Sequence, residues 1–430
     1  MSWELSKFGE TVGGESGIFE LMEDLGRAMT SHPDMLMMGG GNPAPIPAVQ
    51  EIWRDRIREL VDQEPDRLDR ALVNYDPPAG NPRFRAAVAH CLSESYGWPV
   101  SEKNVAVTSG GQSAFFYLFN SLAGDFSNGK RKRVLLPLLP EYIGYANQGV
   151  NPDMFVTCRP KMTEFGDGTF KYHVDFDRVK EAVEQEDIAA ICVSRPTNPT
   201  GNVLDDSEVD QLSEISREKG VPFIIDNAYG FPFPGVIFKD ARPVWDEHVI
   251  LTMSLSKLGL PGTRTAVVIA HEEIIQVVER LTSVCGLANG NIGQAMVTPM
   301  LENGELMRIS REIIRPYYEK RSQRAMSMLH DALADSGGEI AVHRSEGAFF
   351  LWVWFKDLPV TTAELYNRLK ARNLLVVPGK YFFFGKGSEE WKHRDECIRM
   401  TFSQSEAVVE QGIGILADEV KALTAGVPSS

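Results

Sequence analysis

The sequence predicts an α/β protein with a mostly parallel sheet flanked by helices, followed by a smaller α+β domain. Short apolar runs typical of buried strands alternate with helical patterns between about residues 100 and 270. A long helical pattern over 303–336 then separates this part from further strands and helices. The 430 residues, 43% of them apolar, suffice for two hydrophobic cores.

The expected elements follow from the hydrophobic periodicity in chain order. An amphipathic helix over 18–29 precedes a Gly-Pro loop at 39–45. Strands are predicted at 104–108, 133–138, 154–158, 188–193, 221–225, 249–253 and near 265, with helices at 112–122 and 205–219. After the long helical region come a strand at 347–355, a helix at 361–372, strands at 374–377 and 397–402, and a last helix. The expected units are an N-terminal segment (1–48) packing with the small domain, a large domain (49–305), and a linking helix with the small C-terminal domain (306–430).

Composition excludes several classes of function. A formal net charge of −15 disfavours nucleic acid or an acidic membrane as a partner, because either requires a basic face. No run of about 18 uncharged apolar residues is present, so no membrane span is expected. The cysteines are scattered without paired spacing, which indicates a reducing cytoplasm and no metal site. They are Cys91, Cys158, Cys192, Cys285 and Cys397.

Polar side chains follow three successive predicted strands. Asn198 comes shortly after the first, Asp226 and Tyr229 follow the second, and Lys257 follows the third. Because the carboxyl ends of parallel strands share one edge of a sheet, these groups can converge on one crevice. A lysine there can attack a carbonyl if burial and a neighbouring cation such as Arg264 keep its amine unprotonated. The alternative is a solvated surface lysine.

The segment 108–113 joins a predicted strand to a helix and contains two glycines, Gly110 and Gly111. Backbone N–H groups and the helix N-terminus could bind an anion there. An ordinary turn with Ser109 as the helix cap is the alternative. The GxGxxG spacing of dinucleotide-binding enzymes is absent, which disfavours a Rossmann dehydrogenase.

Three of the candidate side chains, Asp226, Asn198 and Tyr142, have both a structural and a functional interpretation. Asp226 could cap a helix or bond a turn, or could keep a ring nitrogen protonated through its charge. Asn198 could occupy a turn before proline, or could orient a phenolic oxygen. Tyr142 could belong to the core, or could stack on a heteroaromatic ring. Arg399, which alternates with apolar residues, suits bidentate capture of a carboxylate.

Together these residues resemble the fold type I pyridoxal-phosphate aminotransferases over nearly the whole chain. The matching motifs are Asn198-Pro199-Thr200-Gly201, Asp226 with Tyr229, Ser254-Leu255-Ser256-Lys257 with Arg264, and Arg399. Longer matching stretches are 36–47, 112–120, 140–145, 193–203 and 254–264. The resemblance implies the fold of this family, pyridoxal 5'-phosphate as cofactor, and a homodimer.

The resemblance also implies a role for each matching residue. Lys257 would bind the cofactor aldehyde covalently, Asp226 would face the ring nitrogen, and Tyr229 would bond the ring oxygen. The remaining implied contacts are Gly111, Gln112, Ser254 and Arg264 to the phosphate, Asn198 to the ring oxygen, Tyr142 to the ring face, and Tyr75 to the phosphate of the neighbouring subunit. The substrate carboxylate would meet Arg399, with Gly41 and Asn198 in the same pocket. Lys257 and Arg264 are seven residues apart where many relatives have eight, so the loop must be tighter.

The substrate is a separate inference. Dicarboxylate enzymes of this type commonly use a second cation about thirty residues beyond the lysine, but residues 281–307 contain no Lys or Arg. This absence predicts a neutral, small-to-medium substrate side chain, such as that of valine, alanine or 2-aminobutyrate. What the resemblance implies in addition is the reaction: transfer between L-valine, or a similar neutral aliphatic amino acid, and pyruvate, giving 3-methyl-2-oxobutanoate and L-alanine. A pyridoxal-phosphate lyase and an aminotransferase for another neutral or aromatic amino acid remain alternatives. A non-catalytic regulator is disfavoured, because a DNA-binding module would need a basic face.

Overall fold

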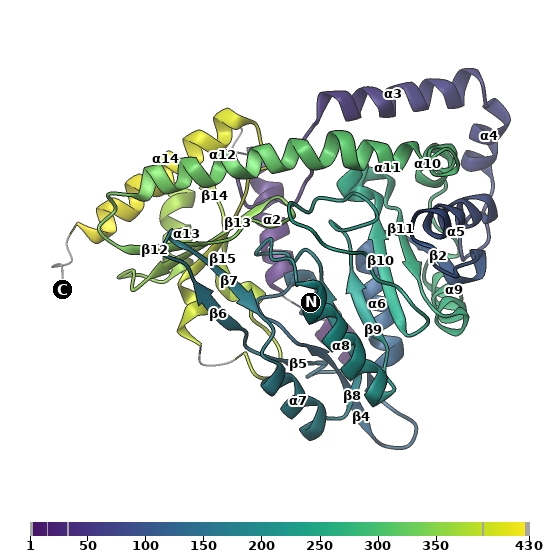
Figure 1. The fold of residues 1–430 in the computed structure, drawn as a ribbon, viewed down its shortest axis with the longest axis horizontal. Coiled ribbons are helices and arrows are strands. Elements are labelled where there is room, and N and C mark those ends of the chain that lie inside the picture. Colours follow the sequence, from purple (N-terminus) through teal and green to yellow (C-terminus); the bar gives the residue numbers. More distant parts are fainter. Residues whose placement is uncertain (1–2, 15, 32–33, 389–390, 426–430) are drawn as a thin grey trace.

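The protein, represented by a computed structural model, is described for residues 3–14, 16–31, 34–388 and 391–425. Two sheets lie side by side in Figure 1, and the long helix α12 (Arg315–Leu333) extends along both. Among the described residues, no helix combines the length and apolar character that a bilayer span requires.

The larger sheet has eight strands in the order β2-β11-β10-β9-β8-β4-β3, with β5 paired to β4. Its strands are β2 (Val105–Thr108), β3 (Gly124–Asp125), β4 (Arg131–Leu136), β5 (Phe155–Thr157), β8 (Ile188–Ser194), β9 (Phe223–Asp226), β10 (Val249–Ser254) and β11 (Ala266–Ile269). The run from β5 through β10 is parallel, whereas β11 is antiparallel to both of its neighbours. The register pairs Ser194 with Asp226 and Asp226 with Thr252, so the ends of the three central strands are level.

Both faces of this sheet are buried. Successive residues of β9 point to opposite faces, and accordingly Ile224 belongs to one apolar cluster while Phe223 and Ile225 belong to the other. Helix α6 (Gly111–Leu122) contacts β10 and β11, and α8 (Asp206–Lys219) contacts β8 and β9. The flanking helices also include α3 (Pro47–Asp62), α4 (Pro65–Val73), α5 (Pro82–Tyr96), α7 (Phe176–Gln185), α9 (Glu272–Gly286), α10 (Ile292–Glu302) and α11 (Glu305–Ile309).

The second sheet has six strands in the order β15-β16-β13-β12-β7-β6. They are β6 (Lys161–Glu164), β7 (Thr169–His173), β12 (Glu339–His343), β13 (Phe350–Lys356), β15 (Val377–Pro378) and β16 (Cys397–Thr401), and α13 (Thr362–Ala371) and α14 (Glu406–Thr424) accompany them. The hairpin of β6 and β7 was not among the predicted strands. Its outer strand is polar and mostly exposed, and β7 is joined to the sheet through the distant β12, so the local pattern is weak. The hairpin lies within residues 49–305, the range predicted for the large domain, although it pairs with the smaller sheet. The domain boundaries remain predictions.

The N-terminal segment lies against the smaller sheet and its helices. It contains α1 (Lys7–Val12), α2 (Gly17–Ser31) and β1 (Leu36–Met37), which pairs in parallel with β14 (Leu374–Leu375). Two acidic side chains hold α2: Glu20 accepts a hydrogen bond from Tyr381 at 2.7 Å, and Asp24 pairs with Lys370 at 2.8 Å. These contacts tie α2 to α13 and to the segment after β15.

Candidate active site

A cavity of about 570 Å³ opens at the carboxyl ends of the central strands of the larger sheet. Elements from both sheets and from the N-terminal segment line it. All but one of the predicted site residues contribute to its wall, namely Gly41, Gly111, Gln112, Tyr142, Asn198, Asp226, Tyr229, Ser254, Lys257, Arg264 and Arg399. The exception, Tyr75, is 80% exposed and lies outside the lining of this chain's cavity.

Lys257 is positioned by the short 3₁₀ helix η3 (Leu255–Leu258) that follows β10. Its Nζ donates a hydrogen bond to the carbonyl oxygen of Gly41 at 2.7 Å. Burial and, next, the positive charge of Arg399 lower the pKa of Lys257 to about 8. A substantial fraction of the amine is therefore neutral near pH 8 and can act as a nucleophile or as a base.

Asp226 ends strand β9 and is 8% exposed. The hydroxyl of Tyr145 donates to its Oδ2 at 2.5 Å, and the N–H of Ala228 donates to its Oδ1 at 2.8 Å. Burial raises the pKa of Asp226, against the effect of these hydrogen bonds. A protonated ring nitrogen beside this carboxylate would provide the opposite charge that stabilises its ionised form.

The turn before α6 forms one end of the cavity. Gly110 has φ of +88°, and a Cβ on it would lie 2.0 Å from Nη2 of Arg264. Glycine therefore lets the guanidinium approach the N-terminus of α6, where it donates to the Ser109 carbonyl at 3.3 Å. The sequence expectation of a tight loop agrees with the 3₁₀ helix η4 (Pro261–Thr263) and the left-handed backbone of Arg264, φ +48°. Backbone N–H groups, a hydroxyl and a cation together suit a phosphate.

Arg399, on β16 of the smaller sheet, also lines the cavity and is 3% exposed. Its Nη1 donates to Oδ1 of Asn198 and its Nη2 donates to the carbonyl oxygen of Gly39, each at 2.7 Å. Its buried Nε has no hydrogen-bond partner. Burial lowers the pKa of Arg399 to about 10, which still leaves it cationic at neutral pH. A carboxylate would satisfy the unpaired N–H, so this side chain fits the carboxylate of an amino acid.

Aromatic side chains form the remaining walls. Tyr229 is buried against Phe349, with ring centroids 5.0 Å apart, and the Nζ of Lys257 lies 5.2 Å from the Tyr229 ring centroid. Tyr142 lines the cavity from the segment after β4. The site therefore combines an amine, a buried carboxylate, a glycine turn beside an arginine, and aromatic faces, and this donor set fits pyridoxal phosphate.

Several residues that line the cavity or hold its lining residues in place were not predicted from the sequence. Ile18, Leu21 and Met22 of α2 line the cavity, although the sequence indicated only an amphipathic helix there. Tyr145 lies behind Asp226, and Glu141 bonds to the end of β8. Both residues belong to the stretch 140–145 that matches the family, and this match was the signal that could have indicated them. Their partners are 81 and 53 residues away in the chain, so the local sequence did not predict the contacts.

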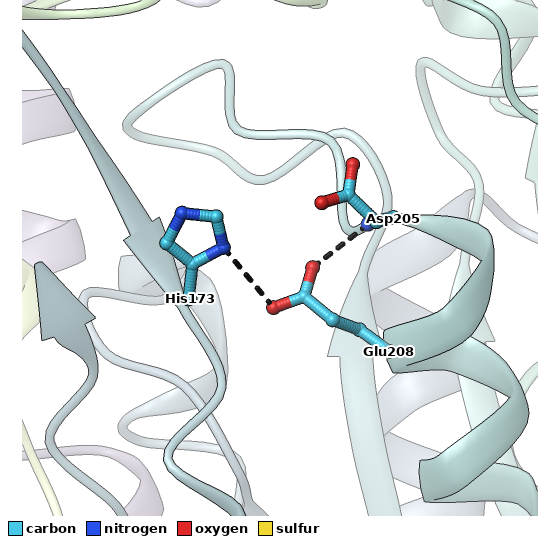
Figure 2. A group of neighbouring side chains, drawn as sticks. All are labelled: His173, Asp205 and Glu208. Atoms are coloured by element: carbon cyan, nitrogen blue, oxygen red, sulfur yellow. Dashed lines mark hydrogen bonds and ion pairs between the residues drawn. The ribbon is translucent and has the colours of Figure 1, made fainter. Parts of the chain in front are cut away.

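A second group of titratable side chains comprises His173, Asp205 and Glu208 (Figure 2), whose potential ligand atoms lie within 4.8 Å of one another. One oxygen of Glu208 accepts from the Val174 N–H at 2.9 Å, and the other accepts from the Asp205 N–H at 2.8 Å. Asp205 pairs with Lys239. These bonds cap the start of α8, so we assign the group a structural role.

Comparison with known proteins agrees with this geometry. The model of the family described as aminotransferase class I and II matches residues 51–416. The chain is 45% identical to valine–pyruvate aminotransferase of Escherichia coli over 416 residues, 97% of this chain and 98% of that protein. The crystal structure of valine–pyruvate aminotransferase from Salmonella typhimurium is similar, with a TM-score of 0.85, 44% identity, and coverage of 95% of this chain and all of the other. An α-aminoadipate aminotransferase from Thermus thermophilus, solved with N-(5'-phosphopyridoxyl)-L-leucine, shares the fold at 23% identity, with a TM-score of 0.78 and coverage of 99% of this chain and 100% of that one.

Proposed function

Because the chain belongs to the class I and II aminotransferases, we propose that it moves the amino group between L-valine, or a similar neutral aliphatic amino acid, and pyruvate. The products are 3-methyl-2-oxobutanoate and L-alanine. The observation that carries the activity is the convergence of Lys257, Asp226 and Arg399 on one cavity.

The enzyme is pyridoxal-phosphate-dependent. When bound, pyridoxal phosphate supplies an electron sink for the charge that develops on the substrate α-carbon and carries the amino group between two half-reactions. We assign its phosphate to the turn at Gly111 and Gln112 with Ser254 and Arg264. Asp226 would hold the ring nitrogen in its protonated form.

The chain's own residues perform the proton transfers and the positioning. Lys257, whose pKa is about 8, can remove a proton from the substrate α-carbon and later return it. Arg399 orients the substrate through its carboxylate, and Asn198 and Gly39 hold the guanidinium in place. The apolar wall contributed by α2 limits the access of water to the reacting atoms.

The lining of the cavity supports a neutral substrate side chain. Of the described residues that line it, the cationic ones are Lys257, Arg264 and Arg399, and each already has a role in the proposed site. The wall near α2 is formed by Ile18, Leu21 and Met37. A second carboxylate on the substrate would therefore face apolar side chains without a partner, which is costly. One methylene more or less on the substrate side chain changes the transition-state free energy by only about 1–3 kcal/mol, so amino acids with related aliphatic side chains should also react.

The test is a side-by-side assay of the purified protein with pyruvate and a panel of amino donors. We expect alanine to form faster with valine and 2-aminobutyrate than with aspartate or glutamate. A preference for aspartate over valine would overturn the substrate assignment. Release of ammonia and an oxo acid without any acceptor would instead indicate the lyase.

We also infer a homodimer. Large apolar side chains are exposed on and after α3 and α4, including Ile57, Val61, Leu72 and Val73, and Tyr75 follows them. A second copy covering this face would bury them and would bring Tyr75 toward the neighbouring phosphate. Sedimentation velocity should then give one species of about twice the chain mass of 47.8 kDa. The free cysteines support a cytoplasmic location.

A further inference from the structure

The segment between β4 and β5 has a buried acid, Glu141, immediately before the cavity-lining Tyr142. We propose that Glu141 is a positioning residue of the reaction: its carboxylate clamps Tyr142 to the end of β8 and thereby sets the face on which the coenzyme ring lies. This inference rests on the proposed function, since it concerns the same site.

The clamp consists of three hydrogen bonds to one carboxylate. Oε1 accepts from the Tyr142 N–H at 2.8 Å and from the Ser194 hydroxyl, and Oε2 accepts from the Ser194 N–H at 3.0 Å. Ser194 is the last residue of β8 and is paired in register with Asp226 of β9. The carboxylate therefore connects the strand end beside Asp226 to the backbone of Tyr142.

Glu141 is 2% exposed, so its charge is costly. Burial, together with the nearby charge of Asp226, raises the pKa of Glu141 to about 8, although the three hydrogen bonds oppose this rise. A glutamine of the same size would avoid the buried charge but would turn an N–H₂ group toward at least one of the three donors. The backbone N–H groups of Tyr142 and Ser194 can only donate and they bond different oxygens, so both positions of the side chain need an oxygen, which glutamate has and glutamine lacks.

The same segment also orients Asp226. The N–H of Tyr145 donates to the carbonyl oxygen of Tyr142 at 3.0 Å, and the Tyr145 hydroxyl donates to Asp226. The rings of Tyr142 and Tyr145 pack edge to face, with centroids 5.3 Å apart. A shift of Tyr142 would therefore be transmitted to the carboxylate that faces the coenzyme ring nitrogen.

The test compares Glu141→Gln with Glu208→Gln in the pyridoxal-phosphate-loaded protein. Glu208 is a matched control, because it is also a buried glutamate that accepts two backbone N–H groups but lies outside the cavity lining. The readouts are the visible circular dichroism of the bound coenzyme, the affinity of the apoprotein for pyridoxal phosphate, and kcat and KM for the amino donor. A milder variant, Ser194→Ala, removes one of the three bonds and serves if Glu141→Gln does not fold.

We expect Glu141→Gln to weaken the coenzyme dichroism and to lower kcat about tenfold to a hundredfold, because displacements of about 1 Å have effects of that order. KM for the donor should change by less than about threefold, since Glu141 does not contact Arg399. Ser194→Ala should show the same changes to a smaller extent. Glu208→Gln should leave the dichroism and kcat unchanged.

Wild-type dichroism and kcat in Glu141→Gln, or equal losses in Glu208→Gln, would overturn the inference. The dichroism does not depend on valine being the donor, because the coenzyme signal is recorded without substrate. Failure of the wild-type protein to bind pyridoxal phosphate would refute the proposed function instead.

Discussion

Replacement of Arg399 by glutamine removes the cation to which we assign the substrate carboxylate. The guanidinium is buried, is held by Asn198 and Gly39 at 2.7 Å each, and has no hydrogen-bond partner at its Nε in the described structure. Glutamine is shorter and neutral, so it cannot reproduce the two parallel hydrogen bonds that a guanidinium gives to a carboxylate.

The size of the effect follows from these bonds. Hydrogen bonds to charged groups contribute roughly 1.5–3 kcal/mol each, and glutamine can replace part of one of the two. We therefore expect the variant to lose about 3–4 kcal/mol of transition-state stabilisation. This corresponds to kcat/KM lower by about 10²–10³-fold. Arg399 also lowers the pKa of Lys257 through its positive charge, so the variant should have a higher Lys257 pKa.

The assay measures kcat/KM for valine with saturating pyruvate, together with the pH dependence of coenzyme capture by the apoprotein. The control is Arg56→Gln, which alters a buried arginine that bonds to Met296 and Glu64 and lies outside the cavity lining. The control should lose stability but keep kcat/KM within about threefold. The assignment of Arg399 is refuted if Arg399→Gln retains kcat/KM within about tenfold of wild type.

Three further predictions concern other parts of the site. The rate at which the wild-type apoprotein captures pyridoxal phosphate should rise with pH through a midpoint near 8, because the neutral amine of Lys257 is the nucleophile. Stopped-flow absorbance measures this rate, and a rate that does not change over a range of about four pH units centred on that midpoint would contradict the prediction. Gly110→Ala should weaken coenzyme binding by roughly a hundredfold in an absorbance titration, because the added methyl meets Arg264 and the φ of +88° is strained; unchanged affinity would exclude the phosphate assignment at this turn. Leu21→Arg should lower kcat/KM for valine and raise that for glutamate, giving a shift of about tenfold or more in their ratio, and Leu21→Met is its neutral control.

The strand-end residues were predictable because the signal is local. Each of β8, β9 and β10 is a short apolar run with a polar residue after it, and parallel pairing brings the strand ends level. Asn198, Asp226 and Lys257 could therefore be expected at one edge before any contact was known. The turn at Gly110 and the buried Arg399 were also indicated by residue type and alternation.

Other features depend on pairings between distant segments. The hairpin of β6 and β7 joins the smaller sheet through β12, and its polar outer strand carries little periodicity. The apolar wall from α2 exists because Glu20 and Asp24 bind residues near the other end of the chain. Such contacts leave no trace in a local pattern of hydrophobicity.

The sequence by itself determined the alternation of elements, the order of the polar strand ends and the residue types available for chemistry, because all of these follow from spacing along the chain. The tertiary structure alone decided that Arg399 lies near enough to Lys257 to lower its pKa, that Tyr145 bonds Asp226 and that Glu141 clamps Tyr142. The physical reason is that a pKa or an orientation depends on burial and on neighbouring charges, and folding assembles these from segments far apart in the chain.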